Sequence, residues 1–518
     1  MAEIMNTDEA TSGAVPEGER LRYTAPERGT SGRSNWLTLP SRQGWAQAVV
    51  LAALYSIPAV MCVYRAYVAD ADVWWHLRAA EWIVQHGGVP HTDPFSSFGA
   101  GKPWAAYSWL FELLMLQLFQ RLGLTGFVVY TAGMLAVITM ALHRLIRRLQ
   151  GDFTLGVLLT FAGTLCLASL WTPRSWLFTI LFFVFELDVL MQARRTGKTG
   201  ELFWLPLVFV LWANLHIQFV VGLLAMGVAV GECVLARFWS GIQTRMGLSR
   251  GCIVFILCVM ATLANPYGWR VYQVVFEYSS QPGVYGLVSE FKALPFRGLQ
   301  DYGVLFFALG AAGMIARARR AEVFEIVMLV FAVLVSFRSQ RDVWVVVPVA
   351  SAMIAQGLKG RADERFQVTA MAAPLIAVAT FLAVFLAFRV LHVNNDALQA
   401  KVEKEMPVRA VEFVKAKGLT GPLYNDFDWG GYLIWGLGIP VSMDGRTNVY
   451  GDAKIARSAA TWSAAADWAS DADLLKANLV IGPVNASLTQ VLRLSPRYEL
   501  VYEDKVAVVF VAREGSAR

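Results

Sequence analysis

The sequence predicts a polytopic α-helical membrane protein with a small α/β domain at its C-terminal end. Of its 518 residues, 56% are hydrophobic and 16% are charged, whereas a soluble globular chain has about 25% charged residues. Apolar runs of roughly 14 to 22 residues recur from Trp45 to Phe388, and several are long enough to cross a bilayer. Beyond Asn394, helical spacing alternates with short β-branched stretches, which is typical of an α/β domain.

Basic loops define the expected orientation. Five short loops each carry three Lys or Arg, and the positive-inside rule places all five in the cytoplasm together with the N-terminus. The loops contain Arg144/Arg147/Arg148, Arg194/Arg195/Lys198, Arg237/Arg245/Arg250, Arg317/Arg319/Arg320 and Lys359/Arg361/Arg365. This solution has about eleven transmembrane helices, at residues 45–66, 124–143, 153–171, 176–192, 203–214, 218–236, 251–264, 303–316, 323–337, 343–358 and 368–388.

Three domains follow from these spans. Residues 1–44 should form a disordered cytoplasmic tail, because residues 1–40 are polar and have no hydrophobic period. Residues 45–389 form the membrane domain, with a first outer loop at 67–107. Residues 390–518 form an extracytoplasmic α/β domain, with a helix expected at 410–415 and strands at 421–425, 439–443, 479–481, 498–502 and 506–511.

One apolar segment does not fit as a span. Counting Trp109–Leu122 as transmembrane would move every later basic loop to the outer side. We therefore expect an interfacial helix at the end of the first outer loop, with Trp109 and Phe111 in the headgroup layer.

The first outer loop is the stretch densest in ionisable groups. It opens with Asp70-Ala-Asp72, and His76 and Arg78 follow on a helix expected from Val73. A carboxylate here can serve as a general base. The alternative is that both aspartates only cap the helix. His76, four residues after Asp72, is either its partner, a metal ligand or a structural residue.

Further polar residues lie at the outer ends of the predicted spans. Together with His76 and Arg78 of the first outer loop, they give the candidate substrate-binding residues, namely Arg174, Asn214, His216, Asn265, Arg270, Arg338 and Arg341. Converging arginines suit a phosphate, because the planar guanidinium binds it with two parallel hydrogen bonds, although arginines also reach toward lipid headgroups. Asn214 and His216 lie at a break between two short spans, where polar residues line cavities more often than they face lipid.

Several classes of function lack support in the sequence. It contains no GxGxxG, Walker, HExxH or GxSxG motif. The five cysteines lie in or beside apolar runs without CxxC spacing, which favours burial over metal binding or disulfides. The net charge of +6 needs no nucleic-acid partner, because the basic excess lies in the membrane half and the N-terminal tail.

The ordered motifs of the chain resemble those of the GT-C glycosyltransferases, and within them a group of bacterial membrane proteins of uncharacterised activity. The motifs are Asp72-Val-Trp-Trp-His-Leu, His86-Gly-Gly-Val-Pro, Asp93-Pro-Phe-Ser, Trp212-Ala-Asn-Leu-His216, Asn265-Pro-Tyr-Gly-Trp-Arg270 and Asn425-Asp…Trp-Gly-Gly-Tyr…Asp444-Gly-Arg. One departure concerns the second outer loop, Trp171-Thr-Pro-Arg-Ser175, which lacks the carboxylate that many relatives carry there.

The resemblance implies an inverting hexosyl- or pentosyltransferase of the bacterial inner membrane. Such an enzyme moves a sugar from a polyprenyl-phosphate donor to a glycan, lipid or protein acceptor on the non-cytoplasmic face. We predict Asp72 as the catalytic base, with Asp70 as second choice, Arg174 and Arg270 as phosphate ligands, and His216 in the same cavity. The need for a divalent cation, Mg²⁺ or Mn²⁺, stays open, with Asp70, Asp72 and His76 as its candidate ligands.

Two other classes remain as alternatives. The first is a lipid or glycan transporter or flippase, in which the intramembrane Glu186, Asp188, Glu232 and Glu325 would matter more than the outer loop. The second is a non-catalytic membrane scaffold with the GT-C fold, which the missing carboxylate in the second outer loop keeps open.

Overall fold

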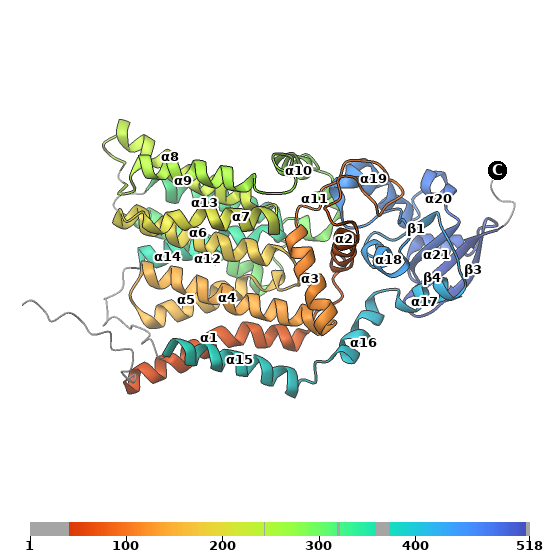
Figure 1. Cartoon of the computed structure of the whole chain (residues 1–518), viewed down its shortest axis with the longest axis horizontal. Helices are drawn as coiled ribbons and strands as arrows, with labels where there is room; N and C mark the ends of the chain where they lie inside the picture. Colours follow the sequence, from red (N-terminus) through yellow and green to blue (C-terminus); the bar gives the residue numbers. More distant parts are fainter. Residues whose placement is uncertain (1–40, 243, 319–321, 359–371, 514–518) are drawn as a thin grey trace, which may run out of the picture.

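The chain folds into a long helical bundle with a smaller α/β domain at one end (Figure 1). The computed structural model describes residues 41–242, 244–318, 322–358 and 372–513. Residues 1–40 of the predicted tail and the basic residues Arg319, Arg320, Lys359, Arg361 and Arg365 lie outside the described residues. The last residues of that tail, 42–44, begin the first bundle helix and are not disordered. The bundle helices are α1 (Arg42–Arg65), α4 (Thr125–Leu149), α5 (Phe153–Cys166), α6 (Trp176–Thr196), α7 (Leu205–Leu215), α8 (Phe219–Phe238), α9 (Leu248–Thr262), α12 (Leu299–Arg317), α13 (Val323–Arg338), α14 (Val343–Gly357) and α15 (Ala372–Val390).

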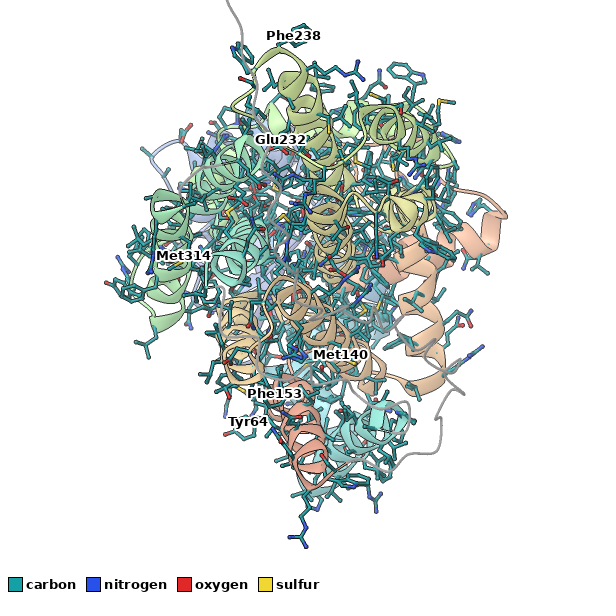
Figure 2. The ribbon with its side chains drawn as sticks, turned by 90° about the vertical axis from the view of Figure 1, so that its left-hand side faces the viewer. Tyr64, Met140, Phe153, Glu232, Phe238 and Met314 are labelled. Atoms are coloured by element: carbon teal, nitrogen blue, oxygen red, sulfur yellow. The ribbon has the colours of Figure 1, made fainter. Side chains whose placement is uncertain are left out.

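The bundle has the properties of a membrane domain. Within the described residues, six helices are long and apolar enough to cross a bilayer: α1, α4, α6, α8, α12 and α15. Large apolar side chains point outward, including Phe306, Leu334 and Phe381, which are each at least 66% exposed. Figure 2 looks along the bundle and shows Tyr64 and Phe238 on its outer surface. Such a surface is stable against lipid tails, whereas in water a patch of this kind is rare.

Each predicted span overlaps a helix of the described structure, although α5 ends at Cys166 rather than at residue 171, and residues 368–371 of the last span lie outside the described residues. The core of the bundle is formed by α4, α6 and α14, with α1 and α15 paired at one edge and α8 at the opposite edge (Figure 2). The structure contains no bilayer, so the number of crossings and their direction stay predictions.

Two helices connect the bundle to the α/β domain. α2 (Val73–His86) starts at the predicted residue, and α3 (Trp109–Leu122) is the segment expected at the interface. Both lie at the end of the bundle beside the α/β domain (Figure 1). α2 packs against α3 on one side and against α18 (Gly430–Leu437) of the α/β domain on the other. α10 (Arg270–Ser279) and the short α11 (Val284–Leu287) lie at the same end.

The C-terminal domain is built on a four-stranded sheet of order β1-β2-β4-β3. β1 (Leu423–Asn425) pairs in parallel with β2 (Leu479–Pro483), and β4 (Ala507–Ala512) pairs antiparallel with β2 and with β3 (Tyr498–Glu503). The remaining helices are α16 (Asn395–Glu405), α17 (Val408–Ala416), α19 (Thr447–Trp462), α20 (Ala472–Lys476) and α21 (Ser487–Leu492).

One strand prediction was wrong. Residues 439–443 form no named strand of this sheet. Instead Val441 pairs with the first outer loop: its N–H donates to the carbonyl of Phe95, and its carbonyl accepts from the N–H of Ser97. The β-branched pattern was interpreted correctly as extended backbone, but its hydrogen-bond partner lies more than 300 residues earlier in the chain, which no local pattern reveals.

Candidate active site

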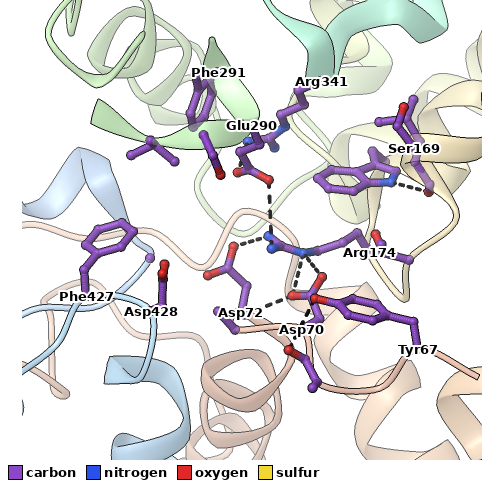
Figure 3. A pocket seen from close by; sticks show the side chains of 18 of the residues that line it. Tyr67, Asp70, Asp72, Ser169, Arg174, Glu290, Phe291, Arg341, Phe427 and Asp428 are labelled. Carbon is purple, nitrogen blue, oxygen red and sulfur yellow. Dashed lines mark hydrogen bonds and ion pairs between the residues drawn. The ribbon is translucent and has the colours of Figure 1, made fainter. Parts of the chain in front are cut away.

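A polar cavity of about 620 Å³ lies where the outer loops of the bundle meet the C-terminal domain. Figure 3 shows it from close by. Its walls come from residues 67–72 before α2, residues 169–176 around the start of α6, residues 288–291 with 340–341, and residues 405–447 of the C-terminal domain. The cavity is therefore made by five segments of the chain that only folding brings together.

Asp70, Asp72 and Arg174 form an ion-paired cluster in the cavity wall (Figure 3). Nε of Arg174 lies 2.7 Å from Oδ1 and 2.8 Å from Oδ2 of Asp70, and its Nη1 donates to Oδ2 of Asp72. The exposed fraction is 4% for the side chain of Asp70 and 13% for the other two. The second outer loop, Trp171-Thr-Pro-Arg-Ser175, thus supplies a cation to this cluster and no carboxylate.

The backbone explains why both aspartates face the same way. The N–H of Asp72 donates to Oδ1 of Asp70 at 3.0 Å, which closes a tight turn between them. Asp72 stands at the N-cap of α2, yet its side chain makes no capping hydrogen bond. Its carboxylate is directed to Arg174 instead, so capping does not account for this residue. Burial raises the pKa of Asp70 above its usual value, although Arg174 opposes the shift.

The C-terminal domain touches the acidic pair through two glycines. A Cβ on Gly445 would lie 1.9 Å from Oδ1 of Asp72, and a Cβ on Gly431 would lie 2.4 Å from the carbonyl oxygen of Ala71. Only glycine permits approaches this close. The Gly-Gly and Asp-Gly-Arg motifs of the sequence are therefore the surfaces that seat the acidic loop.

A second guanidinium faces the same cavity. Nη1 of Arg341 lies 3.4 Å from Oε1 of Glu290, whose Oε2 lies 4.0 Å from Nη2 of Arg174. The guanidinium carbons of both arginines lie 5.1 Å from the ring of Trp176. Because the ring attracts cations and the carboxylate bridges them, two positive groups are held in one wall despite their mutual repulsion.

Asp428 is a cavity residue that the sequence analysis did not select. Its side chain is exposed to the cavity, and the described residues give its carboxylate no hydrogen bond or ion pair. The pKa of Asp428 is raised, mainly because the cavity walls displace solvent around its carboxylate, which nevertheless remains accessible within the cavity. The negative charges of Asp72 and Glu290 raise this pKa further. The only sequence signal was its place after a strand in the Asn425-Asp-Phe-Asp motif.

Of the residues predicted from the sequence, four line this cavity: Asp70, Asp72, Arg174 and Arg341. The others lie elsewhere, namely His76, Arg78, Asn214, His216, Asn265, Arg270 and Arg338. His76 contacts Glu112 behind the cavity, with 3.2 Å between Nδ1 and Oε1. Burial lowers the pKa of His76 and raises that of Glu112 to about 8, so this pair is neutral at pH 7. Arg78 forms a surface ion pair with Glu81.

The remaining predicted residues have structural contacts. Asn214 accepts a hydrogen bond from Nε1 of Trp109, which ties α7 to α3. Nδ1 of His216 lies 2.8 Å from Oγ1 of Thr179, and Asn265 donates to the carbonyl of Ala213. Arg270 reaches the carbonyl of His91 at 3.5 Å, and Arg338 ends α13 outside the cavity wall.

A divalent cation does not fit this arrangement as a preformed site. Carboxylate oxygens are suitable ligands for Mg²⁺ and Mn²⁺. However, Asp70 and Asp72 share the guanidinium of Arg174, which lies where a cation bridging them would lie. His76 is turned toward Glu112. In the part of the chain that the structure describes, no three His, Cys, Asp or Glu side chains are grouped as a metal would require.

A buried ion pair fastens the C-terminal domain over the cavity. Nη1 of Arg446 lies 2.6 Å from Oδ1 of Asp93 in the first outer loop. Its Nε and Nη2 bond to the two oxygens of Asp444, at 2.8 and 2.7 Å. All three side chains are at most 1% exposed. Since a charge left unpaired at such depth is costly, the loop and the domain are fixed relative to each other.

The fold and the site define a helical membrane protein in which the loops at one end of the bundle and the C-terminal domain enclose an ion-paired polar cavity. No family model matches the chain, and neither does any curated protein. Among solved structures it is similar to ArnT from Cupriavidus metallidurans bound to undecaprenyl phosphate, with 13% identity, a TM-score of 0.49, and coverage of 92% of this chain and 100% of that one.

A second similar structure is the Archaeoglobus fulgidus oligosaccharyltransferase tethered with an acceptor peptide. It has 13% identity and a TM-score of 0.47, and the match covers 85% of this chain and 69% of that one. Both are GT-C glycosyltransferases, the superfamily that the sequence motifs resemble. With TM-scores below 0.5, neither likeness assigns an activity to this chain.

Proposed function

We propose that the chain is a membrane glycosyltransferase of the GT-C type. It transfers a hexosyl or pentosyl group from a polyprenyl-phosphate donor to a glycan, lipid or protein acceptor on the non-cytoplasmic face of a bacterial inner membrane. The observation that carries the proposal is the cavity in which Asp70, Asp72 and Arg174 meet Arg341 beneath the C-terminal domain. It lies at the ends of the predicted spans opposite the basic loops, where a lipid-linked donor would present its phosphate.

In this proposal Arg174 exchanges partners when the donor binds. Asp70 holds Nε, which fixes the guanidinium in place. A donor phosphate competes with Asp72 for the Nη edge, because phosphate and carboxylate bind guanidinium in the same geometry. The exchange releases the carboxylate of Asp72 at the moment when the donor is in place. Donor binding therefore frees the carboxylate of Asp72 to act as the general base.

The chemical step then needs only groups of this cavity. The acceptor hydroxyl gives its proton to Asp72, and its oxygen forms a bond to the anomeric carbon of the sugar. The bond from that carbon to the phosphate oxygen breaks, and its electron pair leaves with the polyprenyl phosphate. Arg174 and Arg341 stabilise the charge on the departing phosphate. Attack opposite the leaving group inverts the anomeric configuration.

The transporter alternative is weaker, because most intramembrane acids have structural partners. Asp188 pairs with Arg148 at 3.0 Å, and Glu232 pairs with Arg194 at 2.8 Å. Glu325 accepts a hydrogen bond from Gln356. Glu186 is the member of this set whose oxygens have no partner among the described residues. Ion pairs of this kind fix the packing of helices rather than follow a moving ion.

Comparing envelope glycans and glycolipids of intact cells tests the proposal. Cells expressing wild-type protein should carry a glycosylated product that cells expressing an Asp70→Asn/Asp72→Asn variant at the same level lack. An Arg78→Gln variant is the matched control, since Arg78 lies in the same loop but outside the cavity. If wild-type and double-variant cells had the same glycans and glycolipids, the cavity would not be a glycosyltransferase site.

A further inference from the structure

A smaller cavity of about 280 Å³ lies at the C-terminal end of α1, beside the candidate active site. Its walls come from residues 65–69 and from the last turns of α16. Tyr67, Ala69 and Glu405 line both this cavity and the larger one, so the two cavities share a wall. A molecule in the smaller cavity therefore contacts the segment that leads into the acidic pair.

Three exposed cations surround this cavity, and the described residues give none of them a carboxylate partner. They are Arg65, Lys401 and Lys404. Nζ of Lys401 donates to the carbonyl of Arg65 at 2.9 Å, and Nη1 of Arg65 donates to the carbonyl of Ala168 at 3.2 Å. Within the described structure the side chain of Lys404 has no hydrogen bond or ion pair. Glu405 adds one negative charge to the wall, which leaves an excess of two positive charges.

The cavity lies where a bilayer around the bundle would present its headgroups. α1 has 24 residues, enough at about 1.5 Å per residue to cross a hydrocarbon layer of ~30 Å, and Arg65 is in its last turn. α15 runs beside α1 and leads into α16 (Figure 1). Near the same ends of the two helices, Tyr64 and Val390 are 72% and 64% exposed, and Figure 2 shows Tyr64 on the outer surface. An acyl chain can lie along this apolar surface while its headgroup meets the cations.

This combination of charge and position selects among ligand classes. Lysine and arginine side chains that meet at the end of a membrane helix attract the phosphate of a lipid headgroup. The positive excess favours an anionic lipid over a zwitterionic one, because the amine of a zwitterionic headgroup cancels the charge of its phosphate. Free phosphate has no chain that could use the apolar surface. Glycerophospholipids form the bilayer itself, so they are present at this level in the greatest number.

We propose that this cavity binds the phosphate of an anionic glycerophospholipid of the surrounding membrane through Arg65, Lys401 and Lys404. The bound headgroup supports residues 66–69, the backbone that positions Asp70 in the neighbouring cavity. The inference goes beyond the proposed function and does not depend on it, since this lipid is neither donor nor acceptor of a sugar.

Competition binding to the purified, detergent-solubilised full-length chain tests the site. The reporter is a fluorescent phosphatidylglycerol, and the competitors are unlabelled phosphatidylglycerol, phosphatidylcholine, inorganic phosphate and polyprenyl phosphate. We expect phosphatidylglycerol to displace the reporter at a concentration at least tenfold lower than phosphatidylcholine, because only the former carries a net charge. Inorganic phosphate should not displace it, and polyprenyl phosphate should need a higher concentration than phosphatidylglycerol.

Variants of the two lysines identify the site. Lys401→Gln/Lys404→Gln should bind the reporter at least tenfold more weakly, since each lysine beside a lipid phosphate contributes roughly fivefold. Lys404→Glu should also weaken binding, and its side chain has no bond in the described structure whose loss could disturb the fold. The matched control is Lys415→Gln/Lys417→Gln, which removes the same charge from exposed positions outside the cavity and should bind like wild type. Unfolding temperatures measured without lipid verify that each variant is folded.

Four results would overturn the inference. The first is wild-type reporter binding in both cavity variants, and the second is equal displacement by phosphatidylcholine and phosphatidylglycerol. Displacement by inorganic phosphate would assign the three cations to a soluble anion. Displacement by polyprenyl phosphate at a lower concentration than phosphatidylglycerol would assign the cavity to the polyprenyl carrier instead of a membrane phospholipid.

Discussion

Nε of Arg174 lies 2.7 Å from Oδ1 of Asp70, although the two residues are 104 positions apart in the chain. This ion pair joins the first and second outer loops. It also shows what the acidic motif binds in this structure, because Asp70 and Asp72 face a guanidinium that belongs to the protein itself. The two carboxylates share one cation that the protein itself supplies, and a donor phosphate has an arginine already in place.

Replacing Arg174 should destabilise the protein as well as inactivate it. Arg174→Met leaves Asp70 and Asp72 unpaired in a largely buried wall, and breaking a buried pair in this way costs about 3–5 kcal/mol; partial exposure places the effect toward the lower end. Thermal unfolding of the detergent-solubilised protein measures the loss. An Arg174→Met/Asp72→Asn double variant should regain part of the stability, since one stranded charge is gone. Equal unfolding temperatures for wild type and Arg174→Met would contradict the pairing.

A methyl group at residue 445 should reduce activity with little effect on the fold. A Cβ there would meet Oδ1 of Asp72 at 1.9 Å, so the carboxylate has to move. Since misplacing a reacting group by about 1 Å costs up to 100-fold, we expect Gly445→Ala to lower kcat by roughly 10- to 100-fold. Gly88→Ala is the control, because nothing lies within 4 Å of a Cβ at that position. Wild-type turnover in Gly445→Ala would show that activity does not depend on the position of the Asp72 carboxylate.

The ion pairs of Arg446 should hold the C-terminal domain against the first outer loop. Arg446→Met strands Asp93 and Asp444, which are both fully buried, at a cost of about 3–5 kcal/mol. Limited proteolysis of the membrane-embedded protein is the measurement. Cleavage near residues 97–102 or 440–446 should accelerate in the variant, whereas an Arg493→Met variant, which breaks an exposed pair with Glu503, should cleave like wild type. Unchanged proteolysis in Arg446→Met would show that these ion pairs do not hold the C-terminal domain in place.

Donor binding should strengthen as the pH falls. Asp428 has a raised pKa, so it takes up a proton on acidification before an ordinary aspartate does, and its negative charge disappears from a cavity with five carboxylates and two arginines. A phosphodiester donor keeps its single charge over this range and meets less repulsion. Affinity for a polyprenyl-phosphate sugar measured between pH 5 and pH 8 should therefore fall with rising pH in wild type, and less so in Asp428→Asn. The same slope in both proteins would exclude Asp428 as the cause.

The sequence was informative wherever a local pattern controls the structure. The apolar runs located the helices, and the conflict with the basic loops singled out Trp109–Leu122 as a segment distinct from the other bundle helices. The acidic motif and Arg174 were selected because they stand at span ends. Arg270, also at a span end, lies outside the cavity, while Arg341 lines it. Nothing in the spacing distinguishes the two, because the direction of each side chain depends on how the outer loops pack.

The contribution of the C-terminal domain to the site could not be predicted from the sequence. Asp428 and Gly445 reach the acidic pair through contacts between segments more than 300 residues apart, and the same is true of Val441 against the first outer loop. The strand pattern at 439–443 was interpreted as part of a sheet because its real partner is remote. Long-range docking of this kind depends on surface complementarity, which is not encoded in a window of the sequence.

Turnover by the purified protein in nanodiscs tests the central claim most directly. The substrate is a panel of polyprenyl-phosphate sugars, with hydrophobic glycan, lipid and peptide acceptors, and the readout is release of polyprenyl phosphate. We predict that Asp72→Asn lowers kcat by roughly 10²- to 10⁴-fold at unchanged folding, as expected for the loss of a general base, while Asp428→Asn stays within about tenfold of wild type. Full activity in Asp72→Asn would contradict the account, and a larger loss in Asp428→Asn than in Asp72→Asn would move the base to the C-terminal domain.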